Sequence, residues 1–168
     1  MPELSLSTII LHGLILSIGM GGIILGGMTL NPRIMLSDYP PQIKAQVPPM
    51  TSEDKRQQKI LGIFFWGFAL ALFFYSNSQL AARSGGQLSF GAAFLNSYLV
   101  FQISNLFDFL VLDYLILTVI HPKFLLIPEV NASMLAGTIQ FHFIGFLKGL
   151  IIGAVFAAII ALISIVIW

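Results

Sequence analysis

Four long apolar segments constrain the fold of this chain more than any other feature of its sequence. They cover about residues 6–30, 59–82, 90–120 and 138–168. Each is at least as long as the roughly 20 apolar residues that a transmembrane helix needs. Only 9% of the 168 residues are charged, against about 25% in a typical soluble domain. The sequence therefore predicts an all-α protein, an integral membrane four-helix transmembrane bundle that forms a single domain over residues 1–168.

Basic residues in the connections predict the orientation of this bundle. The loop 31–58 with its flank and the connection 121–137 carry Arg33, Lys44, Lys55, Arg56, Lys59 and Lys123. The connection between the second and third segments carries only Arg83. Because cytoplasmic loops are enriched in lysine and arginine, we expect the loop 31–58 to be cytoplasmic and both termini to be extracytoplasmic.

The loop 31–58 is rich in proline, which favours an extended or semi-rigid connection over a continuous helix. Near its end, Thr51 and Ser52 precede Glu53 and Asp54. A hydroxyl can cap a helix, and acidic residues in the first turn complement the helix dipole. We therefore expect a helix to start at this point.

A polar stripe crosses the third apolar segment. Tyr98, Gln102, Asn105 and Asp108 are spaced by four, three and three residues, so on an α-helix they share one face. A charge near the bilayer centre costs at least about 2.5–3.5 kcal/mol, so the stripe should face other helices or a wet cavity. We expect a ligand or proton site here. Hydrogen bonds that only hold the bundle together are the structural alternative.

Asp113 lies five residues beyond Asp108, which is about 140° around an α-helix, so it should point elsewhere. Asp113 and Lys148 both lie about 20 residues from the outer ends of their segments. Because these segments are joined by a short connection, the two side chains should lie at similar depth. We therefore predict an intramembrane ion pair between Asp113 and Lys148. The alternative is a lysine that reaches the lipid headgroups without a partner.

His121, Glu129 and His142 form a possible polar cluster on the cytoplasmic side. With Asp113 they could form a carboxylate–imidazole site, and such a set could bind a metal ion. However, their spacing matches no known ligand signature, and interfacial histidines bonded to backbone are expected more often. The chain has no cysteine, which excludes disulfides and thiolate ligands. We predict no metal site and no cofactor.

Small residues in the first segment predict close helix packing. Gly13, Ser17 and Gly21 form one row with a four-residue spacing, and Gly22 and Gly26 form a second. Such rows let helix backbones approach each other. A substrate passage lined by backbone is the alternative. The same helix is the candidate contact with another copy or with a membrane-protein partner.

Two patches resemble a family of small bacterial multipass membrane proteins that have no assigned activity. They are NPRIMLSDYP (31–40) with VPPMTSEDKR (47–56), and NLFDFLVLDYLILTVIHPKFLLIP (105–128) followed by FHFIGFLKG (141–149). The resemblance implies a helical protein of the plasma (inner) membrane. It implies no activity, so no residue role rests on it.

Three functions are compatible with these features. The first is a non-enzymatic bundle whose buried polar site binds a small ligand or lipid, or conducts protons, as a transporter-like unit or a subunit of a larger assembly. The second is a membrane enzyme that acts on a lipid at the cytoplasmic face, with the aspartates and histidines as acid–base groups. The third is a structural or assembly factor. No protease, hydrolase or nucleotide-binding motif is present, and a net charge of +1 gives no reason to expect nucleic acid as a partner.

Overall fold

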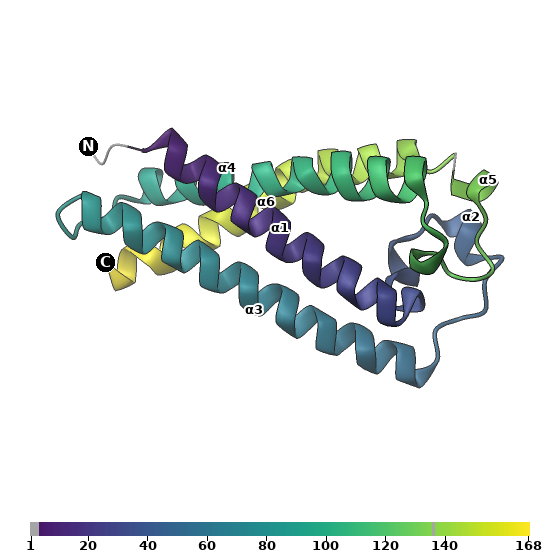
Figure 1. Ribbon diagram of the computed structural model, residues 1–168. Coiled ribbons are helices and arrows are strands. Elements are labelled where there is room, and N and C mark those ends of the chain that lie inside the picture. Colours follow the sequence, from purple (N-terminus) through teal and green to yellow (C-terminus); the bar gives the residue numbers. More distant parts are fainter. Residues whose placement is uncertain (1–3, 136) are drawn as a thin grey trace.

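Four long helices form the bundle in the computed structural model, which describes residues 4–135 and 137–168 (Figure 1). They are α1 (Leu6–Leu30), α3 (Ser52–Arg83), α4 (Phe90–Phe107) with its π-helical continuation η2 (Asp108–Ile120), and α6 (Ile139–Ile167). Each of the four is long and apolar enough to cross a membrane. The described residues contain no β-strand, so the predicted all-helical bundle is confirmed.

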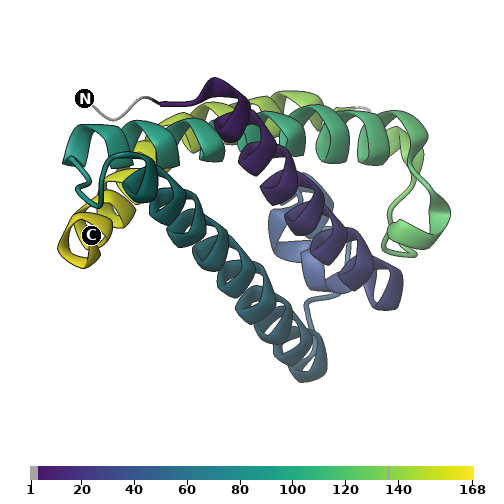
Figure 2. The ribbon, with the colours of Figure 1, turned by 60° about the vertical axis from the view of Figure 1, so that its left-hand side comes forward.

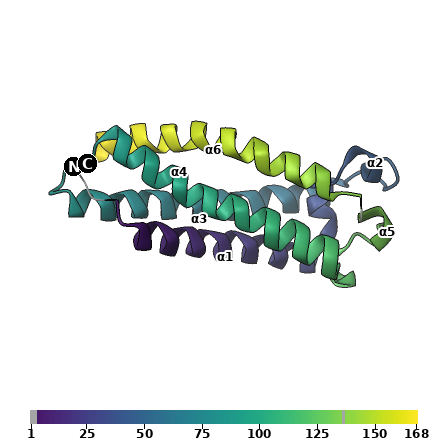
Figure 3. The same cartoon turned by 90° about the horizontal axis from the view of Figure 1, so that it is seen from above.

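The helices pack with α4 at the centre. The most extensive helix pair is α4 with α6, followed by α4 with α1 and then α1 with α3. Seen from above, α6, α4 and α1 lie one after another across the bundle (Figure 3). α3 diverges from α4, η2 and α6 toward one end of the molecule (Figure 2), and it therefore contacts α6 only sparsely.

The surface of the bundle is apolar, whereas several polar side chains lie inside it. Ile63 and Ile151 are each 71% exposed, and Val166 is 86% exposed. Asn77 and Ser164 are 0% exposed. A water-soluble domain keeps most asparagine and serine at its surface. The reversed distribution is compatible with a multipass membrane protein.

The two connections at one end of the bundle pack against each other. We call this the loop end, formed by residues 31–51 and 121–138. It contains the 3₁₀-helix η1 (Pro32–Asp38), the short helices α2 (Pro41–Lys44) and α5 (Ala132–Leu135), and the 3₁₀-turn η3 (Lys123–Leu125). A hydrophobic core joins Leu36, Tyr39, Ile43 and Val47 of the first connection to Leu126, Ile127, Val130 and Leu135 of the second. The connection that was expected to be extended, ordered or semi-rigid is thus an ordered, compact cap with short helical turns, and no continuous helix runs through it.

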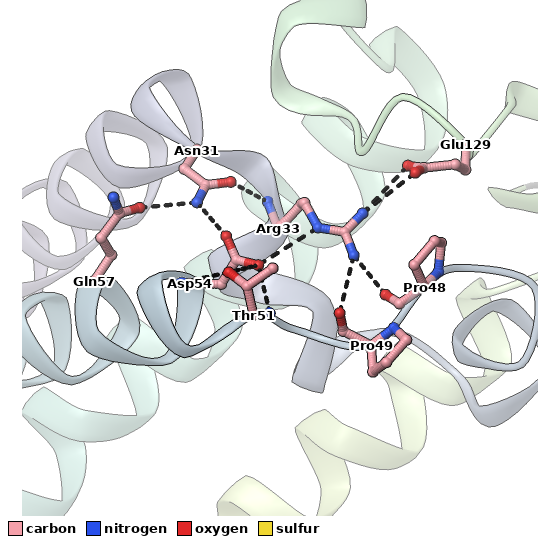
Figure 4. Close-up of polar contacts among 8 residues, drawn as sticks. All are labelled: Asn31, Arg33, Pro48, Pro49, Thr51, Asp54, Gln57 and Glu129. Atoms are coloured by element: carbon pink, nitrogen blue, oxygen red, sulfur yellow. Dashed lines mark hydrogen bonds and ion pairs between the residues drawn. The ribbon is translucent and has the colours of Figure 1, made fainter.

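Arg33 links the elements of this cap (Figure 4). Its guanidinium group contacts Glu129 at 3.3 Å and Asp54 at 3.6 Å, and it donates hydrogen bonds to the carbonyls of Pro48 and Pro49. The side chain of Asp54 also bonds to Thr51 in a capping box at the start of α3, so the expected helix start is confirmed. Arg33 thus ties η1 to α3 and to the second connection.

Replacing Arg33 by lysine should loosen the loop end. Lysine keeps the charge but lacks the planar fork of donors that reaches two carboxylates and two carbonyls. A charge-assisted hydrogen bond contributes about 1.5–3 kcal/mol, so protease cleavage within residues 40–50 should become at least about tenfold faster. Arg56→Lys is the matched control, because Arg56 is exposed and pairs only with Glu53 among the described residues. Equal cleavage rates for both variants would argue against the linking role of Arg33.

The glycines of the two predicted rows lie on different faces of α1. A Cβ at Gly13 would lie 2.7 Å from a side chain of α4, and one at Gly21 would be in ordinary contact with its neighbours. Ser17, between them, is 1% exposed. In contrast, a Cβ at Gly22 or Gly26 would have no described atom within 4 Å. Gly22 and Gly26 are exposed and line an open groove between α1 and α3. Their packing role, including a contact between copies, stays a prediction.

Candidate functional site

The site begins where α4 changes into the π-helix η2 at Asp108. In η2 the backbone bonds run between residues five apart, as from the His121 amide to the Ile116 carbonyl at 2.7 Å. The Thr118 hydroxyl likewise donates to the Asp113 carbonyl at 2.7 Å. A π-helix has more residues per turn than an α-helix, and such segments are frequent at functional sites.

The π-helical turn places Asp108 and Asp113 beside the same cavities. On an α-helix, a five-residue step would separate them by about 140°. In η2 both residues line one cavity toward the loop end and another between η2 and α6. The expectation that Asp113 points away from Asp108 is therefore wrong, because it assumed α-helical geometry.

His142 of α6 is the partner of Asp113. Its Nδ1 lies 3.0 Å from Asp113 Oδ2, and the two side chains are 14% and 20% exposed. Lys148 is exposed and forms no ion pair within residues 4–135 and 137–168. Because six residues of α-helix correspond to about 120° of rotation, Lys148 points away when His142 faces η2. The predicted ion pair between Asp113 and Lys148 is therefore absent.

Three cavities meet at Asp108. The acidic cavity, about 200 Å³, lies toward the loop end and is lined by Asp38, Asp108, Asp113 and His142 together with Tyr39 and aliphatic side chains. The lateral cavity, about 200 Å³, lies between η2 and α6. The apolar cavity, about 270 Å³, extends between α1, α3 and α4 toward the centre of the bundle. Asp108 accepts no hydrogen bond from a described residue. It is an exposed residue, so the three cavities open at the surface of the bundle beside its carboxyl group.

The loop end contributes Asp38 and Tyr39 to the acidic cavity. Asp38 is an exposed residue, but its carboxyl group is partly desolvated at the cavity wall. Desolvation raises the pKa of Asp38 above its usual range; the Ser37 hydroxyl opposes this shift and the nearby Asp113 reinforces it. Burial raises the pKa of Tyr39 to about 12, so its hydroxyl keeps its proton at neutral pH. That buried hydroxyl has no hydrogen-bond partner among the described residues.

The predicted polar stripe divides into three parts. Asn105 donates to the Phe146 carbonyl of α6 at 3.1 Å, and Gln102 reaches the Gly149 carbonyl at 3.5 Å. Tyr98 stacks on Phe94, away from the three cavities. Asn105 and Gln102 thus hold α4 to α6. Asn105 also lines the apolar and lateral cavities, and Asp108 is the acidic member of the stripe, at the place where the cavities meet.

The three members of the predicted polar cluster do not converge. Glu129 pairs with Arg33 and His142 with Asp113. His121 ends η2 in the left-handed backbone region (φ 38°), and its buried Nδ1 has no partner among the described residues. Within residues 4–135 and 137–168, no group of three or more histidine, aspartate or glutamate residues is arranged to hold a metal ion.

A second polar network, which the sequence pattern did not predict, lies near the opposite end of the bundle. Asn77 of α3 donates to Ser97 of α4 at 3.1 Å and to Ser164 of α6 at 2.9 Å. Asn96 of α4 donates to Asn77 at 2.9 Å and to Ser76 at 2.8 Å, and Ser76 contacts His12 of α1 at 2.9 Å. The sequence does hold a signal for this network. Asn77 and Asn96 lie at similar distances from the tight turn that joins α3 to α4, so the two side chains lie at the same level of the bundle.

No protein-family model, curated protein or solved structure matches this chain. The resemblance of residues 31–56 and 105–149 to small bacterial membrane proteins therefore stays a prediction.

Proposed function

We propose that this chain is a multipass protein of the plasma (inner) membrane, with the loop end in the cytoplasm and both termini outside. Four helices of sufficient length and an apolar surface support the membrane location. Arg33, Lys44 and Lys123 lie at the loop end, and enrichment of lysine and arginine in cytoplasmic loops supports the orientation.

Single cysteines at Ser52 and Gln87 test this orientation. Both residues are exposed, at opposite ends of α3 and its following turn, and the natural chain has no cysteine. In intact cells, a membrane-impermeant maleimide should label Gln87→Cys and should label Ser52→Cys only after permeabilisation. Labelling of both variants from one side would rule out the four-span arrangement.

We further propose that the acidic cavity binds a small positively charged ligand, as the binding site of a transporter-like unit. The observation that carries this proposal is the convergence of Asp38, Asp108 and Asp113 on one cavity whose other walls are mainly aliphatic. Among the residues that the structure describes, no lysine or arginine lines this cavity. Carboxylates in a poorly solvated site favour a cation close by, and aliphatic walls favour an organic cation over a bare metal ion.

The volume of the acidic cavity limits the part of the ligand that it can hold. Its volume of about 200 Å³ equals that of roughly six or seven water molecules at about 30 Å³ each. A short alkylamine fits this space, and a drug-sized molecule does not. Asp108 and Asp113 would hold the ammonium group, and His142 would keep the Asp113 side chain in place.

Calorimetric titration of the purified protein in lipid nanodiscs tests the proposal. Butylamine should bind, and butyrate and butanol should not. Asp108→Asn and Asp113→Asn should each weaken amine binding at least tenfold. Glu53→Gln is the matched control, because it removes one exposed carboxylate outside the cavity. Equal binding of butylamine and butyrate, or full amine affinity in both aspartate variants, would overturn the proposal.

Acid–base catalysis on a lipid is the second candidate, and the contact between Asp113 and His142 favours it. A carboxylate beside an imidazole can orient the ring for proton transfer. If this function holds, incubation with labelled phospholipids should give a product that is lost in His142→Gln and retained in Glu53→Gln. Unchanged lipids after incubation with the intact protein would exclude it for those substrates.

A further inference from the structure

The apolar cavity is not used by the function proposed above. It has a volume of about 270 Å³ and is lined mainly by aromatic and aliphatic side chains of α1, α3, α4 and α6. Trp66, one of these residues, is 50% exposed, so this wall lies at the surface of the bundle. Asp108 lines both this cavity and the acidic cavity, together with Ile24 and Leu112. An apolar space thus meets an acidic one at a single carboxyl group.

We infer that the ligand is an amphiphilic alkylamine, with its ammonium group at Asp108 and its hydrocarbon chain in the apolar cavity. This inference rests on the proposed function and names the substrate class of the same site. A single chain fits a cavity of this volume, and the half-exposed Trp66 wall gives it a route from the bilayer. The inference excludes a phosphate beside the amine, because no described residue that lines either cavity is a lysine or arginine that could pair with it.

The fluorescence of Trp66 tests this inference, because Trp66 lines the apolar cavity and the chain has only one other tryptophan, Trp168. The Trp168→Phe protein in nanodiscs is titrated with octylamine that carries bromine at the chain end, which quenches a nearby indole. Quenching should saturate, and excess butylamine should reverse it. The equally long bromo-alcohol should quench without saturation, as expected for simple partition into lipid. Asp108→Asn should raise the half-saturation concentration at least tenfold.

Two controls separate the outcomes. In the Trp66→Phe protein, Trp168 at the other end of the bundle should show no saturable quenching. Replacing phosphatidylcholine by phosphatidylethanolamine in the nanodisc should leave the half-saturation concentration of bromo-octylamine unchanged. A higher half-saturation concentration would mean that phosphatidylethanolamine competes for the site, which would overturn the exclusion of a phosphate. If butylamine binds by calorimetry but bromo-octylamine quenching never saturates, the inference fails and the proposed function stands. If neither amine binds, both fail.

Discussion

Asn77→Leu is expected to destabilise the bundle by about 2–4 kcal/mol. Asn77 is fully buried and takes part in three hydrogen bonds, with Ser97, Ser164 and Asn96, so it joins α3 to both α4 and α6. Hydrogen bonds between helices in a membrane contribute roughly 0.6 to 1.7 kcal/mol each. Leucine breaks all three bonds and leaves the amide of Asn96 with one partner fewer.

Unfolding in a denaturing detergent measures this loss, and Gln79→Leu is the matched control. Gln79 lies on the same helix, is only partly buried and makes no hydrogen bond to a described side chain. Its replacement removes a similar polar group and should change the free energy of unfolding by less than about 0.5 kcal/mol. If both variants unfold alike, the network does not hold the helices together.

Gly149→Leu is expected to be the other strongly destabilising change. Any side chain at Gly149 would overlap the amide group of Asn105, because α6 and α4 approach each other closely at this point. Overpacking typically costs 1–3 kcal/mol. The bonds from Asn105 and Gln102 to the carbonyls of α6 would also be displaced. The expected total is about 2–4 kcal/mol.

The matched control for this change is Gly145→Leu, one helical turn earlier on α6. A Cβ at Gly145 meets no described atom within 4 Å. Both substitutions gain the same helix propensity, so only the contact with α4 differs. A thermal melt should show a clear drop for Gly149→Leu and little change for Gly145→Leu. A similar melting temperature for the two variants would show that close packing at Gly149 is unimportant.

The helices could be predicted from the sequence because their signals are local. Long apolar runs placed the four helices, and Thr51 with Asp54 marked the start of α3. The compact cap at the loop end could not be predicted in this way. Its core and the links of Arg33 join residues that are far apart in the chain, and no periodic pattern reports such contacts.

The site was only partly predictable, and the reason is geometric. Asp108 was singled out because a charge in an apolar segment is costly. His142 was named beside Asp113 in a possible carboxylate–imidazole site, but Lys148 was preferred as the ion-pair partner because it lies at a similar depth, and depth does not report which way a side chain points. The separation of about 140° between Asp108 and Asp113 was wrong because η2 departs from the 3.6-residue repeat. Asp38 was missed because it reaches the cavity from a connection that was expected to be extended.

Cross-linking of paired cysteines tests most directly whether the π-helical turn assembles this site. The chain has no natural cysteine, so Asp108 or Asp113 can be replaced together with His142 and treated with a short bifunctional thiol reagent. Cleavage within the connection 121–137 then reports whether the two halves stay joined. We predict that both aspartate positions cross-link efficiently to position 142 and that position 113 does not cross-link to position 148. Efficient cross-linking of 113 to 148, with none from 113 to 142, would contradict the site described here.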